Sequence, residues 1–303
     1  MHWTQESALP SVGRMTTTLA PALLPPAAWT GHRRGSRGYR RTVVALVCAG
    51  VATFAQLYSP QGILPVVAAG LGVSAPTASL TVSAATLGLA LAVLPWSVVA
   101  DRVGRVRAMR AALVAASALG VLVPFAPTTE LLVAGRFLEG VALGGVPALA
   151  VTLLHEEVHA ARTAVVAGLF VGGASVGGLG GRVIAVAVAE AAGWRVGRVL
   201  AAPVAELAGW RVGLAAVSAL CAVATVAFVL LVPRARGFSP GGASLREVGA
   251  LVTANLRDRG LLVLYANGAL VIGGFVTVYN YLGFRLEAPP YLLSPAITSL
   301  VFF

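Results

Sequence analysis

Seven blocks of about twenty apolar residues follow one another along this chain, and each is long enough to cross the hydrocarbon core of a bilayer. Of the 303 residues, 58% are hydrophobic and only 11% are charged, whereas soluble domains have about 25% charged residues. The sequence therefore predicts an all-α, polytopic membrane helix bundle. The expected spans lie at roughly 42–67, 78–100, 108–126, 131–154, 163–188, 212–232 and 260–283, and an eighth begins near Leu292.

The placement of the arginines predicts the orientation of the chain, because all 22 basic residues are Arg. With a cytoplasmic N-terminus, and with Arg14 and Arg136 left aside, fifteen arginines fall in cytoplasmic segments and five in external ones, with Arg182 among the external five. Cytoplasmic loops of membrane proteins carry such an excess of positive charge. The arginines are not interleaved with aromatic residues, so the net charge of +11 does not indicate a nucleic-acid partner. Membrane lipid is the expected surrounding.

The blocks divide the chain into four parts. Residues 1–41 are polar and rich in Pro and Arg, which is typical of a disordered cytoplasmic tail. Residues 42–232 contain six spans, 233–259 form a long polar connection on the cytoplasmic side, and 260–303 begin a second bundle.

Residues 181–197 recur at 197–213 with 13 of 17 positions identical. A helix turns about 100° per residue, so a shift of sixteen residues rotates its face by roughly 160° and the copies cannot share one face. An additional span would move 234–259 to the external side, against the arginine distribution. We predict that the duplicated segment 181–213 is an external loop or an interfacial helix.

The loop between the second and third spans reads Asp101-Arg102-Val103-Gly104-Arg105-Val106-Arg107. A carboxylate at the end of an apolar helix can pair with Arg and accept bonds from a neighbouring helix N-terminus. Gly104 permits a tight turn. Topology alone also explains a positive loop, but we favour a conformational latch. Its predicted members are Asp101, Arg102, Gly104 and Arg105.

Arg136 lies within the fourth predicted span. A charge there costs about 2.5–3.5 kcal/mol to insert and indicates a function by default. Glu139 follows one turn later, so a structural ion pair is the alternative interpretation. We favour a functional role for this charged pair over a purely structural one.

Glycines and polar residues within the spans give two further predictions. Small residues four positions apart let helices pack closely, which predicts helix packing at Gly140, Gly173, Gly177, Gly178 and Gly181. Polar side chains in the first and seventh spans either line a path for substrate or bond to neighbouring helices. The predicted path residues are Tyr58, Gln61, Tyr279 and Asn280.

These motifs resemble signatures of the major facilitator superfamily. Residues 101–105 resemble its D-R-x-G-R loop, 136–140 its R-x-x-x-G element, and 173–181 its glycine-rich antiporter signature, although Ser97, Val106 and Gly178 replace the usual residues. Segments 53–61 and 279–285 resemble a bacterial branch of sugar and drug efflux permeases. The resemblance implies twelve spans in two halves with the substrate path between them. This chain ends in its eighth predicted span, so we expect a six-helix N-terminal half and a truncated second half.

The resemblance also implies a function. It is export of a small organic solute, drug-like or sugar-like, by alternating access, driven by proton antiport across a bacterial inner (plasma) membrane, with no cofactor. In this resemblance Arg136 and Glu139 serve proton coupling. A transport-inactive truncated bundle is the alternative that the duplication and early end support.

A remote alternative is a membrane metalloprotease, because His155-Glu156-Glu157-Val158-His159 matches the zinc motif H-E-x-x-H. Zinc needs a third protein ligand, and the other histidines, His2 and His32, lie in the tail. We therefore predict no metal and no enzymatic activity.

Overall fold

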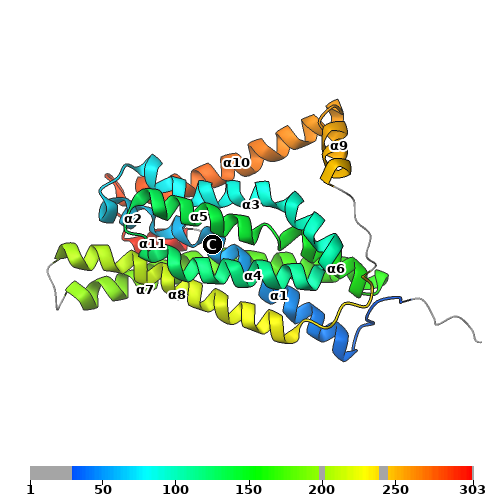
Figure 1. The fold of residues 1–303 in the computed structure, drawn as a ribbon. Coiled ribbons are helices and arrows are strands. Elements are labelled where there is room, and N and C mark those ends of the chain that lie inside the picture. The colour runs from blue at the N-terminus through cyan, green and yellow to red at the C-terminus, as the bar shows by residue number, and fades with distance from the viewer. Residues whose placement is uncertain (1–28, 198–201, 239–244, 302–303) are drawn as a thin grey trace, which may run out of the picture.

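The computed structural model describes residues 29–197, 202–238 and 245–301, and every regular element within these ranges is a helix (Figure 1). Seven segments are long and apolar enough to cross a membrane. They match the seven spans expected from the sequence, so the predicted all-α membrane bundle is confirmed. The segments are Arg37–Leu71, Ala75–Val103, Arg105–Phe125, Thr129–Glu157, Ala160–Ala192, Gly209–Leu231 and Arg259–Glu287.

Several spans are built from more than one helical element. The first consists of α1 (Arg37–Tyr58), the 3-10 helix η1 (Ser59–Ile63) and α2 (Leu64–Leu71). The fourth consists of α5 (Thr129–Leu143) and α6 (Pro147–Glu157). The other elements are α3 (Ala75–Val103), α4 (Arg105–Leu122), η2 (Val123–Phe125), η3 (Ala160–Arg162), α7 (Thr163–Gly197), α8 (Ala202–Leu231), α9 (Leu245–Asn255), α10 (Arg259–Glu287) and α11 (Pro295–Leu300).

Side-chain caps fix where several of these helices begin. Ser36, Ser74, Thr128 and Asp258 each accept a hydrogen bond from the first turn of the helix that follows, which satisfies donors that have no partner within the helix. The main helices then lie side by side, with α1 against α7 and α8, and α3 against α5 (Figure 1).

Helix α10 is attached to this bundle along only part of its length. It slants away from the other helices toward α9 (Figure 1), and its buried residues are Asn280 and Gly283 near its C-terminal end. Its most apolar stretch is entirely unburied. The first six spans therefore form a packed unit, and the seventh contacts that unit at one end.

The N-terminal boundary predicted at residue 41 is too late. Helix α1 begins at Arg37, and Trp29 and His32 already contact the end of α6. The predicted disorder of residues 1–28 lies outside the described residues, as do residues 239–244 of the predicted cytoplasmic connection.

The described residues of the duplicated segment, 181–197 and 202–213, are helical and belong to α7 and α8. Its first copy continues α7 to Gly197 and its second copy begins α8, so the repeat extends two neighbouring helices (Figure 1). One of the differences between the copies explains why a helix continues through the first copy but begins within the second. Position 187 is Ala, which continues a helix, whereas the matching position 203 is Pro, which falls in the first turn of α8, where proline is favoured.

Candidate functional site

A buried ion pair lies where α1, α3 and α5 meet. Nη1 of Arg136 lies 2.6 Å from Oε2 of Glu139, and the two residues are 3% and 0% exposed. The guanidinium also donates to the carbonyls of Thr81 at 3.1 Å, Gln56 at 3.1 Å and Leu57 at 2.8 Å. The predicted pair is therefore formed, and its cation joins three helices.

Proline explains why α1 offers the carbonyl of Gln56 to Arg136. In a regular helix the carbonyl of Gln56 would accept from the backbone N–H of residue 60, but Pro60 has none. The chain passes at this point into the 3-10 helix η1. The guanidinium of Arg136 replaces the missing donor at 3.1 Å, with the hydroxyl of Ser59 as a longer second donor at 3.4 Å. The break in the first span thus provides a hydrogen-bond acceptor for the charge in the fourth.

The second oxygen of Glu139 faces α4 at Gly120. A Cβ at Gly120 would lie 3.1 Å from Oε1 of Glu139 and would also collide with the amide of Gln56. Gln56 donates to the carbonyl of Ala116 at 2.7 Å, and Ser218 of α8 donates to the carbonyl of Gly120 at 2.7 Å. The ion pair thus sits in a polar layer that spans the centre of the bundle.

A second polar cluster brings together the four predicted path residues. Gln61 donates to Oδ1 of Asn280 at 2.7 Å and accepts at Oε1 from Nε of Arg182 at 2.9 Å. The guanidinium carbon of Arg182 lies 4.9 Å from the ring centre of Tyr58 and 5.4 Å from that of Tyr279, which is cation–π distance. Arg182 therefore contacts Gln61 and both tyrosines directly, and Asn280 joins the cluster through Gln61.

This cluster borders a cavity of about 490 Å³ between α1, α7 and α10. Most of its wall is apolar or aromatic, and Arg182 is the charged residue among its lining residues. The lining residues are Phe54, Tyr58, Phe170, Val171, Ala174, Ser175, Gly178, Leu179, Arg182, Ile272, Phe275 and Tyr279.

Arg182 belongs to this site, although the order of the spans places it among the external arginines. It is 5% exposed and lies within the fifth span. The sequence does contain evidence for this role of Arg182. Residue 182 falls inside the predicted span 163–188, and an arginine within a span is a functional candidate. Without Arg182 the asymmetry becomes fifteen against four, so the predicted orientation is unaffected.

Glycines of α7 pack against the backbone of α1. A Cβ would lie 2.9 Å from the carbonyl oxygen of Val47 at Gly173, 2.5 Å from that of Val51 at Gly177, and 2.8 Å from that of Ala55 at Gly181. Gly140 approaches the carbonyl of Ala85 on α3 more closely still. Gly178 differs, because it lines the cavity beside Tyr58 and Arg182.

The loop between α3 and α4 adopts the predicted turn, with Gly104 at a φ of +94°. Asp101 and Arg105 pair at 2.5 Å, but they are only four residues apart. Nε of Arg105 also lies 3.2 Å from Oε1 of Glu156, at the end of α6 in the fourth span. Arg102 is exposed. Glu156 thus contacts a residue of the predicted latch, although the loop motif alone does not contain it.

The neighbouring carboxylate, Glu157, holds the chain that follows α8. Its Oε1 accepts from the backbone N–H groups of Arg236 at 2.5 Å and Gly237 at 2.8 Å. The backbone on either side also pairs with the segment before α1, since the N–H of His32 donates to the carbonyl of Glu157 at 2.7 Å. The end of α6 thus anchors two other segments of the chain.

Comparison with known proteins identifies the family. The family model described as "Major Facilitator Superfamily" matches residues 45–303. The chain belongs to the Major Facilitator Superfamily. It is 34% identical over 271 residues to the inner membrane transport protein YnfM of Escherichia coli, covering 89% of this chain and 61% of that protein. It is 29% identical to the MFS-type transporter YybF of Bacillus subtilis, covering 89% and 63%.

Solved transporters of the superfamily share this fold. A bacterial homolog of the human lysosomal transporter Spinster, in an inward-facing and occupied conformation, superposes with a TM-score of 0.67 at 16% identity, covering 88% of this chain and 57% of that one. The xylose transporter XylE from E. coli gives 0.60 at 16% identity, covering 88% and 70%. The chain spans about three fifths of the length of the curated relatives it matches.

The two curated relatives are membrane transport proteins by name, and this chain shares their family. The metalloprotease hypothesis also conflicts with the geometry, because its general base would be Glu156, which is already paired with Arg105. Within the described ranges, no three or more His, Cys, Asp or Glu side chains are grouped to hold a metal ion.

Proposed function

We propose that this chain takes part in the proton-driven export of a small organic solute by alternating access. The observation that carries the proposal is the proximity of the buried Arg136–Glu139 pair to the cavity at Arg182. The two sites share one segment, since Arg136 binds the carbonyls of Gln56 and Leu57, and the next residue, Tyr58, lines the cavity.

Protonation of Glu139 would change this shared segment. A neutral carboxyl takes the negative charge out of the ion pair, so the hydrogen bond from the charged guanidinium of Arg136 to Glu139 becomes weaker. The guanidinium would then rely more on the carbonyls at the end of α1. A proton at Glu139 therefore biases the position of Tyr58 and of η1, which carries Gln61, and so links proton binding to the solute cavity.

The cavity favours a drug-like solute over a sugar. Its wall offers several aromatic rings and one guanidinium, whereas a sugar would leave many buried hydroxyls without hydrogen-bond partners, at about 1–3 kcal/mol each. A solute with an apolar or aromatic body and one polar or anionic group fits this lining.

The proposed setting is a bacterial inner membrane with the N-terminus in the cytoplasm, supported by the arginine asymmetry and by the inner membrane relatives. Small organic solute, protons and lipid are then the partners. The closely packed glycines of α7 give a tight seam on which α1 and α7 can move as one unit.

The test is dye efflux from cells of a bacterial host that lacks its major efflux pumps. The chain should lower accumulation of amphipathic dyes, and a protonophore should abolish this effect. Arg136→Ala and Arg136→Lys should both remove it, because Lys lacks the planar fork that binds three carbonyls and a carboxylate. Arg107→Lys, at an exposed position in the first turn of α4, is the matched control.

A transport-inactive bundle is the competing function, and the poorly packed α10 favours it. It predicts that the wild-type chain is inserted but exports none of a broad panel of dyes. If wild type exports and both Arg136 variants export equally well, Arg136 is structural and the proton-coupled proposal is wrong.

A further inference from the structure

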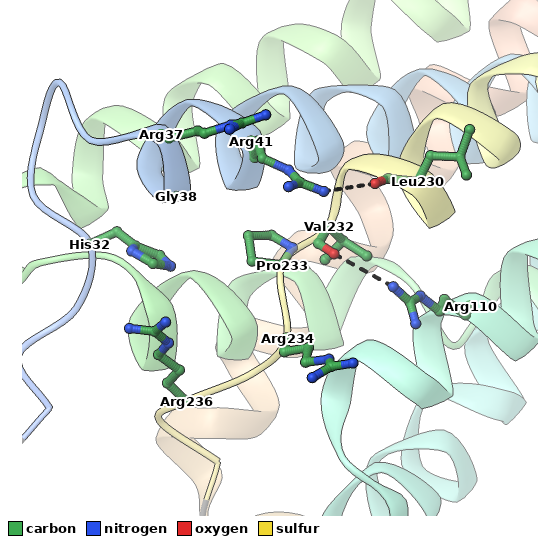
Figure 2. Close-up of a pocket in the computed structure, with 10 residues that line it drawn as sticks. All are labelled: His32, Arg37, Gly38, Arg41, Arg110, Leu230, Val232, Pro233, Arg234 and Arg236. Atoms are coloured by element: carbon green, nitrogen blue, oxygen red, sulfur yellow. Dashed lines mark hydrogen bonds between the residues drawn. The ribbon is translucent and has the colours of Figure 1, made fainter.

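A second cavity, of about 500 Å³, lies at the end of the bundle where α1 begins. Five arginines line it together with His32, and its lining contains no carboxylate among the described residues (Figure 2). They come from α1, α4 and the chain that follows α8. The arginines are Arg37, Arg41, Arg110, Arg234 and Arg236.

Two of these arginines have a structural role. Arg41 donates to the carbonyls of Leu230 at 2.9 Å and Leu231 at 3.0 Å. Arg110 donates through one Nη2 to those of Val229 at 3.1 Å and Val232 at 3.5 Å. Both therefore cap the C-terminus of α8, where cations are favoured. Capping does not use every donor of these arginines. The buried Nε–H of Arg110 has no hydrogen-bond partner in the described part of the chain.

The positive charge of the cavity is not neutralised by the carboxylate that approaches it. This carboxylate is Glu157, which is occupied by the backbone of Arg236 and Gly237 and lies 4.0 Å from Nε2 of His32. Five guanidinium groups around one cavity repel one another unless an anion lies between them. The arginine fork matches phosphate oxygens in particular.

The surroundings of the cavity indicate where such a phosphate would come from. Leu230 lines the cavity and is 68% exposed, and Val226 and Val223 continue the exposed apolar surface along α8 at 55% and 67%. In a membrane, this row would lie against acyl chains. A phosphate group in the cavity would thus be at the right depth to belong to a lipid that lies along α8.

We propose that this arginine cavity binds the phosphate headgroup of an anionic phospholipid. The bound lipid would join α1, α4 and the segment after α8, which leads to the connection between the two halves of the fold. Basic pockets between membrane helices are known to hold anionic headgroups.

Native mass spectrometry of the whole chain, purified in detergent, tests the proposal with added phosphatidylglycerol and, separately, phosphatidylethanolamine. Phosphatidylglycerol should bind at least about tenfold more tightly, since each arginine near an anionic headgroup contributes about fivefold. The double variant Arg37→Gln/Arg234→Gln spares the arginines that cap α8 and should weaken binding roughly twenty-five-fold, at about fivefold per arginine. The matched control Arg246→Gln/Arg257→Gln removes the same charge from exposed sites outside the cavity and should bind like wild type.

An equal loss of phosphatidylglycerol binding in both double variants would indicate general charge attraction and would contradict a specific site in the cavity. Unchanged binding in Arg37→Gln/Arg234→Gln would also overturn it. A competition experiment with glycerol phosphate and inorganic phosphate distinguishes a lipid headgroup from a soluble phosphate as the ligand. If millimolar soluble phosphate displaces the lipid, the cavity is a site for a soluble phosphate and the lipid assignment is wrong.

Discussion

Arg105 and Glu156 face each other across two spans, with Nε of the arginine 3.2 Å from Oε1 of the glutamate. Their side chains are 14% and 18% exposed, so the pair is partly shielded from water. It connects the α3–α4 loop to the end of α6, whereas Asp101 and Arg105 lie on consecutive turns of the chain. We propose that this contact, rather than the Asp101–Arg105 pair, gives the latch its effect on conformation.

A double-mutant cycle with Arg105→Gln and Glu156→Gln checks this. The coupling energy should be about 0.5–1 kcal/mol, near the upper end for exposed pairs because of the shielding. Thermal unfolding in detergent measures it. The parallel cycle of Arg105 with Glu130, an exposed residue at the far end of α5, should give no coupling. A coupling energy near zero for Arg105–Glu156 would show that the contact does not stabilise the protein.

Gly177 and Gly172 on α7 make a matched test of helix packing. Gly177→Ala should destabilise the bundle by roughly 1–3 kcal/mol, because its Cβ meets the backbone of Val51 and α1 must shift. At Gly172 nothing lies within 4 Å of an added Cβ, so Gly172→Ala should be neutral or slightly stabilising. Equal unfolding temperatures for the two variants would contradict the packing role.

Arg182 should determine solute affinity in the proposed cavity. Arg182→Gln loses a charge-assisted interaction, and binding of an anionic amphipathic dye should weaken about tenfold to a hundredfold, from about 1.5–3 kcal/mol. Arg182→Lys keeps the charge but cannot bind Gln61 through two nitrogens, so an intermediate affinity is expected. Fluorescence titration of the purified variants measures this, with the exposed Arg285→Gln as control. Unchanged affinity in Arg182→Gln would place the solute elsewhere.

The predicted orientation is tested by labelling single cysteines in intact cells, after Cys48→Ala and Cys221→Ala. A cysteine at Gly241 should resist an impermeant maleimide, because the positive-inside rule places 233–259 in the cytoplasm. A cysteine introduced by Pro127→Cys, at an exposed position between η2 and α5, should react. The reverse pattern would invert the topology.

The sequence alone determined the number and position of the spans, the glycine seam of α7 and the charged pair within the fourth span. These features are local: an apolar stretch of twenty residues, a spacing of four, or an arginine within a span carries its meaning without knowledge of its neighbours. The tertiary structure decided the partners. Glu156 pairs with Arg105, and Pro60 explains why Arg136 can bind the carbonyl of Gln56 on α1.

Arg182 shows most clearly why the partners of a residue depend on the tertiary structure. Its sequence position near the end of a span allowed an external placement, but its partner Gln61 is 121 residues away and is reached only once α7 packs against α1. The arginine cavity likewise forms only where three segments meet, namely α1, α4 and the end of α8 with the chain that follows it. Hydropathy fixes which segments enter the membrane, whereas helix packing fixes which charges meet there.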